Sequence, residues 1–202
     1  MVAYIFDDIL NRGASQAPQK TADARTWYRN QASKIAASPM TLMNSDRSRM
    51  RKIPLLGSMY LFKYDPKYKE TLPYYDTFPL IFPIASTKSR GIASSGPAFY
   101  GINLHYLPLR LRARLMDALY STATNKTIDE TTRLKISYNI LSSASKYKYF
   151  QPCIKQYLFK HVRSQFFYVA PQEWDIALFM PLERFKKATK AAVHRQSIRG
   201  IK

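Results

Sequence analysis

The sequence contains few of the residues that build metal centres, disulfides or phosphate-binding loops. Its single cysteine, Cys153, can form no disulfide within the chain, and free cysteines are usually small buried side chains. The three histidines, His105, His161 and His194, are far apart and fit no zinc-binding spacing. The six glycines match neither a Walker nor a dinucleotide-binding pattern, and no Gly-x-Ser-x-Gly motif is present. We therefore expect no catalytic residue, no metal and no cofactor.

Acidic residues are scarce as well. The chain has 13 Asp and Glu against 32 Lys and Arg, a formal charge of +19. No Asp or Glu occurs in residues 77–116, in residues 131–172, or after Glu183. Such a surplus repels itself in a folded protein unless a partner neutralises it. The composition therefore predicts an anionic partner.

Long hydrophobic runs are absent, since the apolar segments fall far short of the roughly 20 residues that a membrane helix needs. The first eight residues, MVAYIFDD, lack the pattern of a signal peptide. We expect a protein without membrane contact, used in a reducing cytoplasm or assembled there into a larger particle. A hydrophobic content of 46%, with 11 Phe and 15 Tyr, excludes a fully disordered chain.

Residues 1–57 are predicted to be an N-terminal helix and an extended basic arm. Apolar residues at helical spacing favour a helix from Thr21 to about Ala37. Residues 38–57 are rich in Ser, Met, Pro and basic residues, which predicts an extended linker or a segment lying on a partner. The candidate partner-binding residues of this arm are Trp27, Tyr28, Arg47, Arg49, Arg51 and Lys52.

Residues 58–202 are predicted to form one α+β domain. Aromatic and apolar segments at 58–65, 78–84 and 99–106 indicate three strands. Pro79 and Pro83 would place the second of them at an edge or bend it. Residues 165–170 predict a strand that rejoins this sheet, which would cover 58–107 and 165–170. We expect a small curled antiparallel sheet or half-barrel.

Helical periodicity follows in residues 108–161. Pro108 suits a first helical turn, Thr127 and Glu130 match a capping box, and a third helix is predicted from Pro152 to His161. Pro171 opens a short helix, and Pro181 opens a basic C-terminal helix over 181–202. The prediction is thus an inserted helical subdomain within an α+β fold, preceded by the extended N-terminal arm.

A basic protein invites comparison with a nuclease, which needs two or three carboxylates around a hard cation. Asp65, Glu70 and Asp76 are close in the sequence. The segment Asp65-Pro-Lys-Tyr68 is, however, a good turn by itself, so a turn flanked by ion pairs explains it better. The sequence does not show an active site.

Basic residues interleaved with aromatic ones remain, as in KYKYF at 146–150 and KQYLFKHVR at 155–163. Such segments suit phosphate contact beside stacked rings, although a solvated basic face over core tyrosines is the alternative. The candidate nucleic-acid or polyanion contacts are Arg110, Arg114, Lys146, Lys148, Lys155, Arg163, Lys186, Lys187 and Lys190.

Several segments resemble a family of late virion proteins from large contractile-tailed phages, of the DNA-end-protector, head-completion type. The resemblance is carried by residues 59–67, 72–84, 101–108, 133–138, 160–163 and 173–185, segments that extend over most of the chain after residue 58. It implies a virion protein that is not an enzyme and that shields the end of the packaged genome. Its partners would be double-stranded DNA or other virion proteins of the portal, neck, tail or baseplate.

Two functions remain open from the sequence. The first is non-specific DNA binding near the genome end or the head–tail junction. The second is a structural subunit of tail or baseplate, in which the basic surface and residues 1–57 bind neighbouring virion proteins. The sequence leaves open whether the chain forms a symmetric homo-oligomer.

Overall fold

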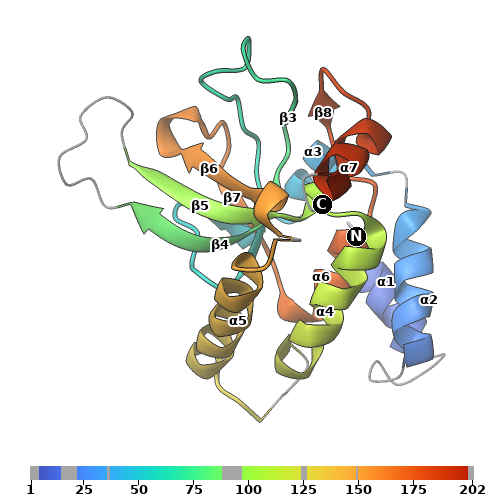
Figure 1. Ribbon diagram of the computed structural model, residues 1–202. Helices are drawn as coiled ribbons and strands as arrows, with labels where there is room; N and C mark the ends of the chain where they lie inside the picture. Colours follow the sequence, from blue (N-terminus) through green and yellow to red (C-terminus); the bar gives the residue numbers. More distant parts are fainter. Residues whose placement is uncertain are drawn as a thin grey trace.

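The centre of the protein is an open antiparallel sheet of six strands (Figure 1). The computed structural model describes residues 5–14, 22–35, 37–87, 97–123, 127–148 and 150–199. The strands lie in the order β1-β7-β2-β4-β5-β6, and β3 and β8 form a separate pair. Their bounds are Met50–Arg51 (β1), Met59–Leu61 (β2), Tyr75–Asp76 (β3), Leu80–Thr87 (β4), Ala98–Asn103 (β5), Ile154–Leu158 (β6), Phe166–Val169 (β7) and Phe185–Lys186 (β8).

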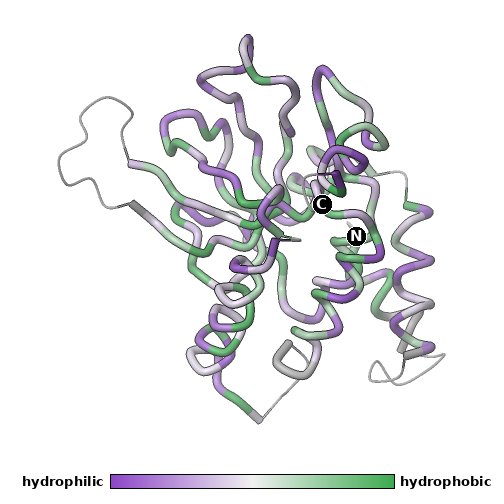
Figure 2. The backbone as a smooth tube through the Cα atoms, viewed as in Figure 1, coloured by the Kyte–Doolittle hydropathy of each residue, from purple (hydrophilic) through white to green (hydrophobic). Residues whose placement is uncertain are grey.

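The helices contribute to a hydrophobic core on one face of the sheet. Their buried apolar side chains join a single cluster with Leu61, Phe82 and Phe167 of the strands. Figure 2 shows the alternation of hydrophobic and hydrophilic residues along α2 that such one-sided packing requires. The helices are Ile5–Ala14 (α1), Ala22–Ser33 (α2), Pro39–Ser45 (α3), Leu109–Ala123 (α4), Glu130–Ser145 (α5), Trp174–Phe179 (α6) and Lys190–Arg199 (α7).

The opposite face of the sheet carries an aromatic cluster of strand residues and their flanks. The ring of Phe62, just after β2, lies 5.3 Å from that of Tyr157 in β6, which is three strands away. Neighbouring strands are about 4.8 Å apart, so three steps would span about 14 Å in a flat sheet. The sheet therefore curls around these rings, as predicted, without closing into a barrel.

The predicted strands β2, β4, β5 and β7 and helices α2, α4, α5 and α6 are confirmed. Of the two prolines, Pro83 lies within β4 and Pro79 just before it, and the strand is internal to the sheet rather than at an edge. Its register with β5 shifts between Pro83 and Ala85, while β2 pairs on its other side. The predicted capping box is wrong, because Asp129 rather than Thr127 caps α5.

The structure corrects the extended arm predicted for residues 38–57. Ser38 accepts a hydrogen bond from the amide of Thr41 and caps α3, so that Leu42 and Met43 are buried in the main core. β1 then pairs with β7 at the edge of the sheet. The domain boundary proposed at residue 57 stays a prediction.

Two predicted helices are also corrected. Residues 154–158 form β6, which pairs with β5 from Ile154 to Leu158. Their apolar spacing suits a helix or a strand, and pairing with the exposed edge of β5 decides between them. The basic helix starts at Lys190 rather than Pro181, because β8 pairs with β3 first. Within the described ranges, no helix is long and apolar enough to cross a membrane.

Candidate nucleic-acid interface

Residues 62–74, between β2 and β3, form a long loop across one end of the sheet (Figure 1). Hydrogen bonds tie it to the connection between β6 and β7. The amide of Arg163 donates to the carbonyl of Lys63 at 2.8 Å, and the amide of Asp65 donates to the carbonyl of His161 at 3.1 Å. Two segments that are about 100 residues apart in the sequence are thereby held side by side.

The other flank of this loop lies against β8. Tyr75 of β3 pairs with Lys186 of β8. The ammonium of Lys187 donates a hydrogen bond of 2.7 Å to the carbonyl of Glu70. Loop 62–74 therefore brings together cations from three separate parts of the chain.

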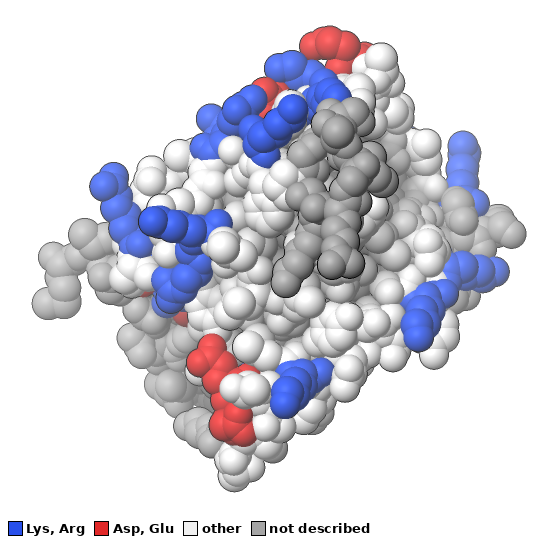
Figure 3. Space-filling view, turned by 90° about the vertical axis from the view of Figure 1, so that its left-hand side faces the viewer, with Lys and Arg blue, Asp and Glu red and all other residues white. Residues whose placement is uncertain are grey.

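These segments form what we call the basic loop surface. Asp65 accepts hydrogen bonds from Lys69 at 3.1 Å and Arg163 at 3.4 Å, and the other acidic residue of these segments is Glu70. Figure 3 shows Lys and Arg side chains gathered along the upper edge of this side of the molecule, with acidic side chains beside them. Seven cations minus two carboxylates leave a formal charge of +5. The cations are Lys63, Lys67, Lys69, Lys160, Arg163, Lys186 and Lys187.

A cavity of about 490 Å³ opens beside the basic loop surface, and we call it the tyrosine pocket. One wall is loop 62–74 with β3, and the other is β6 with the end of β5. Its tyrosine rings provide flat apolar faces, and charged and amide side chains lie among them. The lining includes Tyr64, Lys67, Tyr68, Tyr74, Tyr75, Asp76, Asn103, Tyr106, Lys155, Gln156 and Tyr157.

Lys155 is the partly buried cation of the tyrosine pocket. Its ammonium lies 4.2 Å from the centre of the Tyr106 ring, a cation–π contact. Burial lowers the pKa of Lys155, because the charged form loses water. Within the described part of the chain, no carboxylate forms an ion pair with it.

The carboxylate of Asp76 is buried in the lining of the pocket, and both of its oxygens accept hydrogen bonds from the protein. Its Oδ2 is 2.6 Å from Nδ1 of His105 and 3.3 Å from Nδ2 of Asn103. Its Oδ1 accepts hydrogen bonds from the amides of Phe78, at 3.0 Å, and Arg184, at 3.4 Å. Asp76 therefore joins β3 to the end of β5 and to the segment before β8.

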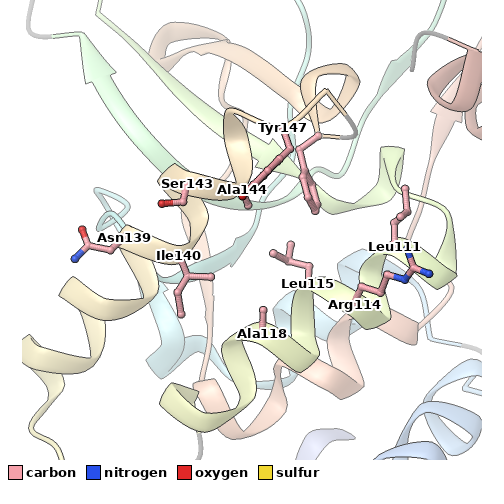
Figure 4. A pocket seen from close by; sticks show the side chains of 10 residues that line it. Leu111, Arg114, Leu115, Ala118, Asn139, Ile140, Ser143, Ala144 and Tyr147 are labelled. Atoms are coloured by element: carbon pink, nitrogen blue, oxygen red, sulfur yellow. The ribbon is translucent and has the colours of Figure 1, made fainter. Parts of the chain in front are cut away.

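A second cavity, of about 560 Å³, lies between α4 and α5. Figure 4 shows Leu115 and Ala118 of α4 facing Ile140 and Ala144 of α5 across it. The lining is mainly apolar. This cleft therefore suits an apolar side chain better than a phosphate.

Four predicted contact residues lie around this cleft. Arg114 belongs to its lining, and the exposed Arg110 is one turn earlier on α4. Lys146 and Lys148 are exposed on either side of Tyr147, another lining residue. The structure thus separates this group from the basic loop surface, which contains the predicted Arg163, Lys186 and Lys187.

The remaining predicted contacts are divided between ion pairs and solvent. Lys190 lies 2.8 Å from Glu183, and Arg49 pairs with Asp46 and with the buried Glu173. Among the other residues of the proposed arm, Tyr28 is buried, Trp27 is partly buried, and Arg47, Arg51 and Lys52 are exposed. Contact with DNA or a partner stays a prediction for each of them.

The three carboxylates of the nuclease alternative do not converge. Asp65 pairs with Lys69 and Arg163, whereas Asp76 is buried beside His105. Glu70 is exposed. In the ranges that the structure describes, no group of three or more His, Cys, Asp or Glu side chains could hold a metal ion.

Residues 7–198 match the family described as the phage T4 terminal DNA protecting protein. The chain belongs to this family. The resemblance seen in the sequence is confirmed, and the match also includes α1, α2 and α3, where the resemblance was not evident. Comparisons with curated proteins and with solved structures gave no match.

Membership of the terminal DNA-protecting family identifies a bacteriophage protein associated with DNA. The candidate contacts named from the sequence do not include four cations of the basic loop surface, Lys63, Lys67, Lys69 and Lys160, although Lys160 lies in the basic–aromatic segment 155–163. The signal was present, because 63–69 interleaves basic and aromatic residues as 146–150 does. From the sequence, that segment is instead interpreted as a turn flanked by ion pairs, because it contains Asp65-Pro66.

Proposed function

We propose that this terminal DNA-protecting protein binds the end of duplex DNA through the basic loop surface, without catalysis and without reading base sequence. The family match over residues 7–198 carries the proposal. The surface supports it, because it carries seven cations that can pair with phosphates, and the carboxylate of Asp65 holds Lys69 and Arg163 in place. No element of this surface is a helix that could enter the major groove.

Bound phosphates release condensed counterions, so the affinity should fall steeply as salt rises. The first experiment compares binding to blunt linear duplex and to a closed circle of equal length across a salt series. A preference for the linear form that weakens with salt supports the proposal. No binding to either DNA at moderate salt would overturn it.

A charge-removal pair then locates the interface. The triple variant Lys63→Gln, Lys67→Gln, Lys160→Gln removes three exposed cations of the basic loop surface. The control Lys34→Gln, Lys135→Gln, Arg195→Gln removes three exposed cations elsewhere. Each lost phosphate contact should reduce the slope of log affinity against log salt by about 0.9. Equal losses of DNA affinity in both variants would mean that the affinity depends only on the net charge of the protein.

Contact with a virion protein is a second candidate for a different surface. Ile53 and Leu55 are 69% and 56% exposed, next to the exposed Arg51 and Lys52. Exposed apolar groups rimmed by cations suit a neighbouring protein with an acidic surface. The double variant Ile53→Ser, Leu55→Ser should retain DNA affinity but enter particles at a reduced copy number. Unchanged copy number would dismiss this contact.

A further inference from the structure

The tyrosine pocket has the size and lining of a small-molecule site. Ligand sites commonly measure about 300–1,000 Å³, and this cavity measures about 490 Å³. Tyr64, Tyr68, Tyr74, Tyr75, Tyr106 and Tyr157 all contribute to its wall. Stacking on aromatic rings is how proteins hold unpaired bases without selecting among them.

Lys155 indicates the charge that a ligand of this pocket would carry. A partly buried ammonium without a carboxylate partner is unfavourable unless an anion enters beside it. The Tyr106 ring lies 4.2 Å from its ammonium, and among the described residues no carboxylate forms an ion pair with it. A phosphate in the pocket would provide the anion, and Lys67 adds a second cation at the lining.

The polar groups at the base of the pocket predict that bases are not distinguished there. The Asn103 amide donates to Asp76 and to the Tyr157 hydroxyl, at 3.1 Å, and its oxygen accepts from the amide of His105. The Asp76 oxygens hold their own protein donors. These groups are therefore not offered to the edge of a base.

The pocket also lies where a DNA end would arrive. Lys67 and Tyr68 belong both to its lining and to loop 62–74, which carries the basic loop surface. A duplex held by its phosphates on that surface has its last nucleotide close to the opening. A cavity of about 490 Å³ lies in the size range of pockets that hold one small ligand, which suits a single nucleotide.

We propose that the tyrosine pocket receives the terminal nucleotide of a DNA strand, unpaired from its complement, with the base on the tyrosine rings and a phosphate at Lys155. The inference rests on the proposed function, since it names what that function captures. Withdrawing the last nucleotide into protein would also deny an exonuclease the end on which it acts. Unpairing has an energetic cost that is smallest where the last nucleotide is already unpaired.

The experiment uses the full chain with three DNAs of one sequence: a blunt paired end, an end with one unpaired nucleotide on the 5′ or the 3′ strand, and a closed circle. The pocket variant is Tyr68→Ala, which should fold because this ring is 60% exposed. The control is Tyr147→Ala, a tyrosine 64% exposed at the α4–α5 cleft.

The protein should bind the unpaired end about tenfold more tightly than the paired end. Tyr68→Ala should remove the difference in affinity between the unpaired and the paired end, whereas Tyr147→Ala should keep it. Equal affinity for paired and unpaired ends would overturn the pocket while leaving the proposed function intact. Failure to bind any of the three DNAs would overturn the proposed function.

A titration with deoxynucleoside monophosphates separates these failures further. All four nucleotides should bind with similar affinity and shift the NMR signals of the pocket tyrosines. Lys155→Gln should lower the affinity for all four. Absence of binding at millimolar concentration would contradict a nucleotide site. If the protein binds the mononucleotides but shows no preference for DNA ends, the pocket is a nucleotide site that has no role at the genome terminus.

Discussion

The guanidinium of Arg112 lies 2.6 Å from the carboxylate of Glu183, and both side chains are buried. Arg112 also donates hydrogen bonds to the carbonyls of His105, Leu107 and Leu178. One side chain of α4 therefore joins the end of the sheet to the end of α6 and to the segment before β8. These contacts fix the segment 105–107, which includes Tyr106 of the tyrosine pocket.

Arg112→Met should destabilise the protein by about 3–5 kcal/mol. The substitution removes the guanidinium donor from three carbonyls, of which that of His105 keeps His194, and removes the buried partner of Glu183. Arg110→Met, at an exposed position on the same helix, should change stability by no more than about 0.5 kcal/mol. Urea unfolding of both variants measures the difference, and equal effects would contradict a buried network.

Acid should weaken the protein through Glu183. Burial alone would raise its pKa, but neighbouring His105, Arg112 and Lys190 lower the pKa well below its ordinary value of 4.5. A lowered pKa in the folded state gives stability that is complete above pH 4.5 and is lost as pH falls below that value. Unfolding free energies at pH 7, 4 and 3 should therefore decrease more for the wild type than for Glu183→Gln. Parallel decreases would show that other carboxylates dominate.

Gly57→Ala should destabilise the protein by at least about 1 kcal/mol. Gly57 has a φ of +83°, and a Cβ there would lie 2.7 Å from the carbonyl oxygen of Leu134 in α5. Neither the backbone conformation nor the neighbouring helix accepts a side chain. Thermal unfolding should show a lower Tm than for Lys52→Ala, an exposed control in the same segment. A Tm equal to that of the control would contradict the close approach.

Cys153 should be unreactive in the folded protein. The thiol is fully buried, and burial raises its pKa to about 12, so the reactive thiolate is rare at neutral pH. A thiol reagent at pH 8 should label it slowly without denaturant and rapidly in concentrated urea. Rapid labelling of the native protein would show that β6 and its flanking turns open readily.

The strands were predictable where the chain carries a local signal. Residues 58–65 and 99–106 are aromatic and alternate, so their strand conformation could be predicted without distant information. Residues 154–158 carry an apolar spacing that suits a helix as well, and only pairing with β5 selects the strand. The polar composition of residues 38–57 predicts an extended segment. In the structure Arg49 donates a hydrogen bond to the buried Glu173, 124 residues away, a contact that the local sequence does not indicate.

The sequence predicts the charge of the partner better than it predicts which residues form the site. The surplus of 32 cations over 13 carboxylates indicates an anionic partner without any structure. Arg163, Lys186 and Lys187 were named from the sequence, whereas Lys63, Lys67, Lys69 and Lys160 were not. Lys155 was named as a polyanion contact, and the structure adds that it is partly buried in the lining of the tyrosine pocket.

The sequence by itself determined the net charge, the single thiol, the aromatic strands and the family, because each of these depends only on residues and their order. The tertiary structure alone decided which cations share a surface and which tyrosines line one pocket. Loop 62–74, the β6–β7 connection and β8 meet through backbone hydrogen bonds between residues about 100 positions apart. Such partners are set by the register of the curled sheet, which no local pattern encodes.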